Sequence, residues 1–460
     1  MSTPPTANIP SDSTPGLELQ ADRVVPRKQV ISWALWDWAT QPYNTIILTF
    51  VFTALYLTSD SFISPELAAL PEDDTKRILA IDALSGQFGL ALFLAGLAIA
   101  VLAPVMGQRS DASGRRKFWL LVNTALVVIC MALLFFVQAA PGFFVLGVAL
   151  VAIASVFSEI ANVSYNAMLV QVSTPKTVGK VSGLGWGLGY IGGIVALIIV
   201  VVLTQLDWFG MPLENGMAYR VIALGCAVWT VIFVIPIILN VPEAPATVRR
   251  EEVNFFQSYV RLAQDIASLY RESRDTFWFL VASAVYRDGL AGVFAFGAII
   301  ATGTFKFSSN EVMIFGIAAN LVAGVSTIIS GRFDDRFGPR AVILASLIGL
   351  VVAGTATFLL HDAGAIAFWV FGLILCAFVG PAQSASRSLL ARVTPAGREG
   401  EIFGLYATTG RAASFLSPGL WALLIGVFGF QYWGILGIVL VLAIGLVLMY
   451  FVKAGARTRA

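Results

Sequence analysis

Charged residues are scarce in this chain. They make up only 12% of its 460 residues, whereas 58% are hydrophobic and the mean hydropathy is +0.84. Soluble domains carry roughly a quarter charged residues. The scarcity of charge therefore excludes an ordinary soluble protein and predicts a chain that crosses a lipid bilayer several times.

Metal-ligating and redox residues are also few. The only histidine, His361, lies at the end of an apolar run, so no buried histidine relay is expected. The three cysteines, Cys130, Cys226 and Cys376, lie in apolar runs and form no metal-ligand spacing. The sequence contains neither a GxxxxGK[ST] loop nor a catalytic triad. We therefore expect no metal, no cofactor, no nucleic-acid partner, no ATP-driven step and no enzyme activity.

Twelve apolar runs are long enough to cross a bilayer as helices, which takes about 20 residues each. They cover approximately 30–57, 80–106, 118–138, 142–170, 181–205, 218–240, 276–302, 311–331, 340–360, 364–392, 402–427 and 430–452. Basic residues gather in alternate loops, and the loops of the other side hold only four: Lys76, Arg77, Arg220 and Lys306. The positive-inside rule then predicts both termini in the cytoplasm of a protein integral to the plasma (inner) membrane.

Two loops repeat the same pattern. The sequences GQRSDASGRRK and GRFDDRFGPR both read Gly-x3-Asp-x2-Gly-x-Arg, beginning at Gly107 and at Gly331. A second echo, between STPKTVGKVSGLGW (173–186) and VTPAGREGEIFGLY (393–406), has nearly the same offset. Two echoes at similar offsets predict two six-helix halves in parallel orientation.

The repeat divides the chain into five predicted parts. These are a disordered cytoplasmic tail without a signal peptide (1–29), a first half (30–240), a cytoplasmic linker (241–275), a second half (276–453) and a short cytoplasmic tail (454–460). The linker carries apolar residues at helical spacing from Phe255 to Leu269, which predicts an amphipathic helix at the membrane surface.

Several segments resemble a known transporter family. GQRSDASGRRK resembles the signature loop of the major facilitator superfamily. Its vacuole-effluxer-like branch, named after the fungal autophagy-related amino-acid effluxer, is similar in four further segments: WALWDWATQPYNTIILTFVF (33–52), GKVSGLGWGLGYIGG (179–193), YRDG (286–289) and SASRSLLARVTPAGREGEIFGLYATTGR (384–411). The branch usually has asparagine where Arg287 stands. The resemblance implies an all-α membrane protein with twelve transmembrane helices in two parallel six-helix halves.

The signature loops are candidates for a conformational latch. A carboxylate at the end of a span stabilises a helix N-terminus or pairs with arginines of its loop. In the superfamily this loop latches the two halves together. The resemblance carries that role over to Gly107, Asp111, Gly114, Arg115 and Arg116, and by the repeat to Asp335, Gly338 and Arg340. The alternative is a topology loop that only obeys the positive-inside rule.

Polar stripes mark four spans, and in a bilayer such stripes usually face a cavity or a protein partner. The candidate residues for the cavity or for coupling are Asp37, Gln41 and Asn44 in the first span, Glu159 and Asn162 in the fourth, Arg287 and Asp288 in the seventh, and Gln383 and Arg387 in the tenth. The resemblance implies that these four spans line the central cavity. On the fifth span, Gly185, Gly189 and Gly193 predict close helix packing.

The adjacent charges Arg287 and Asp288 need separate partners, because neighbouring residues on a helix point in different directions. We expect Asp288 to pair with Arg411 of the eleventh span or with a proton. Arg287 would then turn to the cavity and face Glu159 or Asp37 of the other half. A pair that breaks as the halves rock would couple proton movement to transport. The alternative is a fixed ion-pair network that fastens helices.

The function expected from these features is secondary transport of small polar solutes by alternating access. The resemblance implies amino-acid efflux, driven by a proton gradient or by the gradient of the solute. Three alternatives remain: a translocase of lipids or lipid-linked precursors, a drug or metabolite exporter, and a solute sensor. The expected partners are the bilayer, a small-molecule substrate and protons, and the expected state is a monomer.

Overall fold

The structure is a computed structural model that describes residues 24–57, 59–71, 74–210, 214–243, 260, 264, 267, 269–271, 274–305, 307, 309–394, 398–413, 415–428 and 432–452. All regular structure in these ranges is helical. A chain surrounded by lipid must satisfy its backbone hydrogen bonds internally, which long apolar helices achieve. The amphipathic helix expected in the linker lies mostly outside the described residues.

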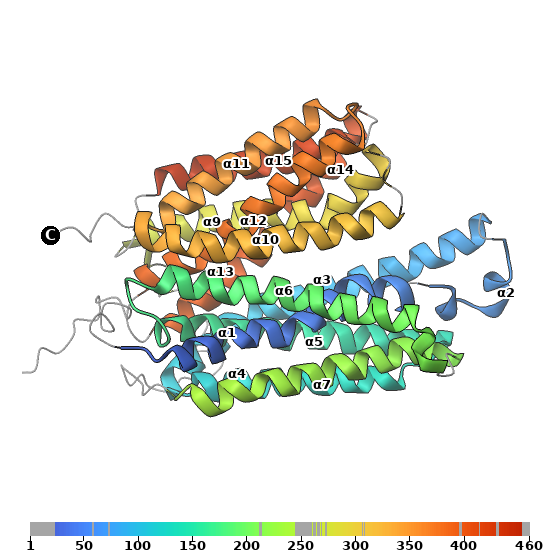
Figure 1. Ribbon diagram of the computed structural model, residues 1–460, viewed down its shortest axis with the longest axis horizontal. Coiled ribbons are helices and arrows are strands. Elements are labelled where there is room, and N and C mark those ends of the chain that lie inside the picture. Colours follow the sequence, from blue (N-terminus) through green and yellow to red (C-terminus); the bar gives the residue numbers. More distant parts are fainter. Residues whose placement is uncertain are drawn as a thin grey trace, which may run out of the picture.

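The first bundle contains helices α1 to α7, which Figure 1 shows in its lower half. Their bounds are α1 Arg27–Pro42, continued by η2 Tyr43–Phe50 and η3 Phe52–Leu57; α2 Pro65–Ala68; α3 Thr75–Ser113; α4 Arg116–Leu133; α5 Phe144–Ala167; α6 Val178–Gln205; and α7 Met217–Asn240. The first predicted span is thus not one regular α-helix. Proline has no amide hydrogen, and the chain widens into π-helix directly after Pro42.

The second bundle contains helices α9 to α15 and occupies the upper half of Figure 1. Their bounds are α9 Arg274–Ile299, continued by η10 Ile300–Thr304; α10 Ser309–Phe337; α11 Pro339–Leu359; α12 Ala365–Val393; α13 Glu399–Ala412; α14 Leu416–Phe428; and α15 Trp433–Phe451. The eleventh predicted span, 402–427, is broken between α13 and α14. Pro418 near the start of α14 explains the break, because proline is tolerated only in the first turn of a helix.

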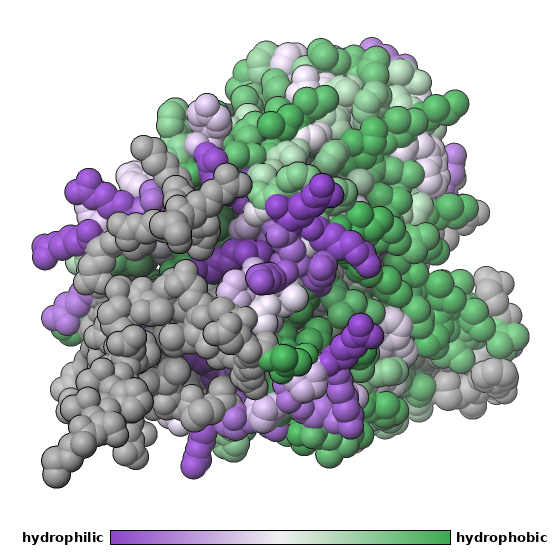
Figure 2. All heavy atoms as spheres, turned by 60° about the vertical axis from the view of Figure 1, so that its left-hand side comes forward, coloured by the Kyte–Doolittle hydropathy of each residue, from purple (hydrophilic) through white to green (hydrophobic). Residues whose placement is uncertain are grey.

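Nine helices within the described residues are long and apolar enough to cross a membrane. The three remaining predicted spans fall on α1 with its π-helical continuation, on α3, and on α13 with α14. Large apolar side chains such as Val145, Ile232 and Val352 are exposed on the outer faces of the helices. Figure 2 shows hydrophilic side chains gathered at one end of the molecule and an apolar surface along its sides.

The two bundles touch mainly through α6 against α10 and through α3 against α13. Helix α1 begins and helix α15 ends at the same end of the molecule, which we call the terminal end (Figure 1). The two bundles diverge toward the opposite end. A row of glycines on α6 lies so near α10 that an added Cβ would collide with it: Gly179, Gly183 and Gly187. The second row, Gly185, Gly189 and Gly193, instead faces α1 and its continuation, in keeping with the predicted packing role.

The repeated loops fasten equivalent helices in the two bundles. Lys117 donates through Nζ to the carbonyls of Ile238 (3.0 Å) and Val241 (2.7 Å) at the end of α7. Arg340 donates through Nε to the carbonyl of Val452 (2.7 Å) at the end of α15. A cation at a helix C-terminus stabilises its unpaired carbonyls. Arg340 therefore has a partner within its own bundle, in place of the predicted contact between the halves.

Candidate functional site

A carboxylate joins the two bundles at the terminal end. Asp335, in the last turn of α10, accepts hydrogen bonds from the backbone amides of Gly179 (2.8 Å) and Lys180 (3.0 Å) at the start of α6. The first amides of a helix lack partners within the helix and carry partial positive charge, so they attract a carboxylate. Asp335 therefore links α10 of the second bundle to α6 of the first, and its role as a latch stays a prediction.

A second set of contacts reinforces this one. Arg392, near the end of α12, donates through Nη1 to the carbonyl of Pro175 in the first bundle (2.7 Å). Its Nη2 lies 3.2 Å from Asp334 Oδ1 and 3.3 Å from Asp335 Oδ1. Ser388 also donates to the buried carboxylate of Asp334. We call Pro175, Gly179, Asp334, Asp335 and Arg392 the terminal clasp.

Of the charged side chains in the clasp, the sequence predicted only Asp335 and not Asp334 or Arg392. Asp334 stands next to the aspartate that the repeat marks, and Arg392 resembled an ordinary positive-inside residue. The paired aspartates of GRFDDRFGPR were the available signal, since two adjacent carboxylates at a span end need two cationic or helix-terminal partners.

The remaining latch candidates have varied surroundings. Gly338 (φ 86°) and Gly114 (φ 63°) occupy left-handed turns between helices, a backbone conformation that glycine adopts readily. Arg115 is exposed, whereas Arg116 is buried and has an interaction partner. Gly107 and Asp111 are outside the residues whose side chains the structure describes, so their latch role stays a prediction.

Deeper inside, Arg387 of α12 binds three helices of the first bundle. It donates through Nε to Ser182 Oγ (3.0 Å) and through Nη2 to the Ser182 carbonyl (2.6 Å) on α6. Nη1 donates to Asn166 Oδ1 on α5 (3.0 Å) and lies 3.5 Å from Asp37 Oδ2 on α1. The Arg387 side chain is only 4% exposed and that of Asp37 is 18% exposed. This buried ion pair therefore joins the two bundles.

Aromatic rings enclose the pair. Trp33 and Trp36 both stack on Tyr165 with ring centroids 4.3 Å apart, and the Tyr165 hydroxyl donates to Asp37 Oδ2 (2.9 Å). The Arg387 guanidinium lies 5.2 Å from the Trp33 ring. Cation–π attraction and the exclusion of water strengthen an ion pair in such a cage. We call Asp37, Tyr165, Ser182 and Arg387, with these rings, the cross-bundle cage.

A glycine leaves room for the cage. A Cβ atom added at Gly185 would lie 2.9 Å from Asp37 Oδ2 and 3.0 Å from Arg387 Nη2. One turn further along α6, the same atom at Gly189 would make an ordinary contact of 3.5 Å with the Cβ of Asp37. Gly185 thus leaves space for the two charged groups, and it also allows the helices to approach each other.

The expected partners of the adjacent charges need correction. Asp37 is paired with Arg387, not with Arg287. Asp288 accepts a 2.6 Å hydrogen bond from the backbone amide of Ser417, at the start of α14. It therefore stabilises the N-terminus that the break in the eleventh span exposes. Arg411 lies outside the described side chains, so its predicted pairing with Asp288 stays a prediction.

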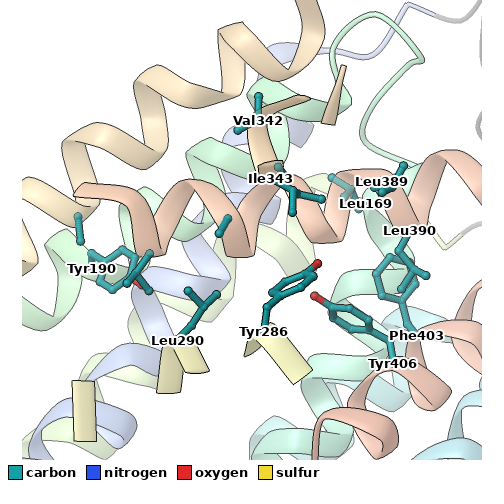
Figure 3. Close-up of a cluster of buried hydrophobic side chains, with 14 of the residues drawn as sticks. Leu169, Tyr190, Tyr286, Leu290, Val342, Ile343, Leu389, Leu390, Phe403 and Tyr406 are labelled. Carbon is teal, nitrogen blue, oxygen red and sulfur yellow. The ribbon is translucent and has the colours of Figure 1, made fainter. Parts of the chain in front are cut away.

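Arg287 has a partner in its own bundle. Its Nη1 donates to the carbonyl of Tyr406 on α13 (2.7 Å), and its guanidinium carbon lies 3.8 Å from the centroid of the Tyr406 ring. Figure 3 shows Tyr406 beside Tyr286 in the buried cluster, where the Tyr286 hydroxyl is 2.5 Å from Ser386 Oγ. These contacts fix the position of the Arg287 side chain.

The other candidates lie on the predicted helices and are partly buried: Gln41, Asn44, Glu159, Asn162 and Gln383. Gln41 donates to Thr45 Oγ1 (3.2 Å) within its own span, and Asn44 and Glu159 both have interaction partners. No group of metal-ligating side chains large enough to hold an ion occurs among the described residues.

Comparison with known sequences identifies the family. Residues 171–459 match the family described as "Vacuole effluxer Atg22 like". The chain belongs to this family. It is 26% identical to the uncharacterized MFS-type transporter YxiO of Bacillus subtilis, over 94% of this chain and 96% of that protein. It is 24% identical to autophagy-related protein 22 of Cryptococcus neoformans, over 58% of this chain but only 49% of the fungal protein. The chain thus spans about half the length of that fungal relative.

Solved structures show the same fold. The proton:xylose symporter XylE superposes with a TM-score of 0.71 at 13% identity and covers 93% of this chain. The transporter FucP in its outward conformation and a bacterial homologue of the iron transporter ferroportin, in its outward-facing state, each superpose with a TM-score of 0.65. The Atg22-like chain is therefore a major facilitator transporter, an integral membrane protein and not an enzyme.

Proposed function

We propose that this Atg22-like protein is a proton-coupled secondary transporter that exports small polar solutes, amino acids first among them, by alternating access. The observation that carries the proposal is the ion pair between Asp37 and Arg387, which joins the two bundles inside an aromatic cage. The proposal places the protein in the plasma membrane with both termini in the cytoplasm, so the terminal end is the cytoplasmic end.

The proposed cycle follows from the contacts at that end. The terminal clasp and the cross-bundle cage hold the cytoplasmic ends together while the opposite ends diverge, which corresponds to an outward-facing state (Figure 1). Opening toward the cytoplasm requires α6 and α1 to part from α12. Arg387 would then leave Asp37, whose carboxylate keeps only the Tyr165 hydroxyl. A carboxylate that loses its cationic partner in a dry site binds a proton more readily, so rocking is coupled to protonation.

The substrate class has weaker but consistent support. The fungal relatives carry the name autophagy-related protein 22, and the family is described as vacuole effluxer like. Polar side chains on α1, α5, α9 and α12 suit a small polar solute better than a lipid tail.

Transport in liposomes tests the proposal. Purified protein is reconstituted and an inside-acidic pH gradient is imposed, so that protons leaving the vesicle exchange for solute entering it, as in proton-driven export. Uptake of a labelled mixture of L-amino acids is then measured. We expect the gradient to drive uptake by the wild type and not by Asp37→Asn, which keeps the shape of the side chain but cannot release a proton. The control is Arg27→Gln, an exposed position at the start of α1.

The outcomes separate the parts of the proposal. The proposal requires that Asp37→Asn still exchanges the labelled amino acids when no gradient is imposed. The variant would then retain the solute path and lack only the coupling between solute and proton movement. Gradient-driven uptake that survives in Asp37→Asn would remove Asp37 from the coupling. A tight, folded wild type that moves no amino acid but moves a fluorescent lipid would favour the translocase alternative.

A further inference from the structure

A second arginine, Arg287 of α9, is fixed in place but only half satisfied. Its Nη1 is bonded to the Tyr406 carbonyl, and the Tyr406 ring covers one face of the guanidinium. Within the described residues, Nε and Nη2 have no hydrogen-bond acceptor, and no carboxylate lies within ion-pair distance. The Arg287 side chain is only partly buried.

Arg287 shares a face of α9 with a residue that contacts the first bundle. Arg287, Ala291 and Phe294 fall on one helical face, at i, i+4 and i+7. Ala291 and Phe294 are exposed, and Phe294 stacks against Tyr190 of α6 in the other bundle (6.2 Å between centroids). Arg287 therefore extends from the same face of α9 through which Phe294 contacts the first bundle.

The geometry of the free edge selects a particular chemistry. Nε–H and one Nη2–H of a guanidinium point in parallel along one edge, the arrangement that binds both oxygens of a carboxylate. Because the described residues offer no anion here, a cationic side chain at membrane depth lacks the partner that normally offsets its desolvation. An anionic group on a bound solute would supply that partner.

Gly410 on α13 leaves room for the Arg287 guanidinium because it has no side chain. A Cβ added at Gly410 would lie 2.9 Å from Arg287 Nη1 and 3.1 Å from its guanidinium carbon. The space above Gly410 is thus filled by the guanidinium itself. Together with Tyr406, this fixes the direction of the free edge before any solute arrives, which lowers the entropic cost of binding.

We propose that Arg287 binds the carboxylate of the transported solute, so that the site accepts amino acids and other small carboxylates and rejects their amides. The inference rests on the proposed transport function and names its substrate class. Arg287 is then a specificity-determining residue of the solute site, whereas Arg387 closes the path on the cytoplasmic side of it.

Equilibrium binding tests this inference separately from transport. Purified protein is heated with a pool of neutral L-amino acids, with the matching pool of L-amino-acid amides, with propanoate, or with inorganic phosphate, and its unfolding temperature is recorded. We expect the acid pool and propanoate to stabilise the wild type and the amide pool to have little effect. In Arg287→Gln the affinity for the acid pool should fall about 30-fold or more, since two charge-assisted hydrogen bonds are lost.

Further variants keep the test decisive. Arg287→Lys, which retains the charge without the paired donors, should bind the acid pool about tenfold more weakly than the wild type and so recover part of the loss. The exposed control Arg27→Gln should match the wild type. Equal stabilisation by acids and amides, stabilisation by phosphate alone, no stabilisation by any probe, or an unchanged acid response in Arg287→Gln would each overturn the inference. Proton-driven uptake that persists alongside such a result would leave the proposed function intact, whereas acid-selective binding without proton-driven uptake would sink only the coupling.

Discussion

Two arginines at membrane depth have opposite surroundings. Arg387 makes three hydrogen bonds to the first bundle, lies 3.5 Å from Asp37 and is 4% exposed. Arg287 makes one hydrogen bond, to the Tyr406 carbonyl of its own bundle, and is only partly buried. A charge in a bilayer is costly unless it is paired, so the two side chains offset that cost in different ways. Arg387 is paired with Asp37 of the first bundle. Arg287 has one hydrogen bond, within its own bundle, and its remaining donors are free for a solute.

The difference assigns different tasks to two similar groups. A side chain whose donors are all bound across a moving interface changes partners only when the interface opens, which suits a gate. A side chain held rigidly within one half, with a two-donor edge left over, suits a ligand.

Removing the gate arginine should have the most severe consequence. Arg387→Ala leaves the largely buried Asp37 without a cation, and breaking a buried pair in this way typically costs about 3–5 kcal/mol. We expect amino-acid uptake in liposomes to fall at least 100-fold and the unfolding temperature to drop. Arg387→Lys should rescue stability in part but not uptake, because an ammonium cannot reach Asn166 and both Ser182 atoms at once.

Arg287→Lys is the matched substitution for that comparison. It should keep more of the uptake than Arg387→Lys, because only one protein hydrogen bond depends on its guanidinium. Equal losses in the two lysine variants would contradict the separate roles of the two arginines.

The clasp arginine should affect the conformational balance more than the solute site. Arg392→Ala removes the contacts from α12 to Pro175 and to both clasp aspartates. We expect the cytoplasmic side to open more often. A cysteine placed at Ser384, which is buried at the interface near Ser182, should react several-fold faster with a maleimide added from that side. An unchanged labelling rate, with Arg27→Gln as the control, would show that the clasp does not hold this state.

Sequence patterns located most of the groups in this contrast but not their pairing. Polar stripes on the first and tenth spans marked Asp37 and Arg387, and the repeated loop marked Asp335. Which arginine meets Asp37 depends on how two separate bundles are rotated and placed, and a hydropathy pattern carries no such information. From the sequence, Asp37 was therefore only one of two expected partners of Arg287, the other being Glu159.

The fold could be predicted from the sequence better than the site, because bilayer thickness fixes the length of apolar runs. Length alone, however, hid two irregular helices. The runs at 30–57 and 402–427 are both long enough to cross a bilayer, yet Pro42 precedes a π-helical stretch and Pro418 follows a break. That break creates the helix N-terminus at which Asp288 accepts from the Ser417 amide, a partner that the continuous eleventh span did not suggest.

Two glycines one turn apart on α6 provide a smaller and better-controlled test of the cage. Gly185→Ala places a methyl group against the pinned oxygen of Asp37 and the guanidinium of Arg387, whereas Gly189→Ala makes only an ordinary contact. We expect Gly185→Ala to lower uptake a few-fold and Gly189→Ala to leave it close to that of the wild type. The readout is initial uptake at matched protein density, and a larger loss in Gly189→Ala would contradict the cage geometry.

The smallest effect is expected beside the solute arginine, at Asp288. Its carboxylate accepts from the Ser417 amide at the start of α14, a capping contact whose loss typically costs about 1 kcal/mol. Asp288→Asn keeps an oxygen that can accept this bond, so we expect a nearly unchanged unfolding temperature and persistent gradient-driven uptake. Asp288→Ala should lower the unfolding temperature without changing the preference for acids over amides. Loss of proton-driven uptake in Asp288→Asn, with stability retained, would instead make Asp288 a coupling group, and the contrast would then lie between two carboxylates and not between two arginines.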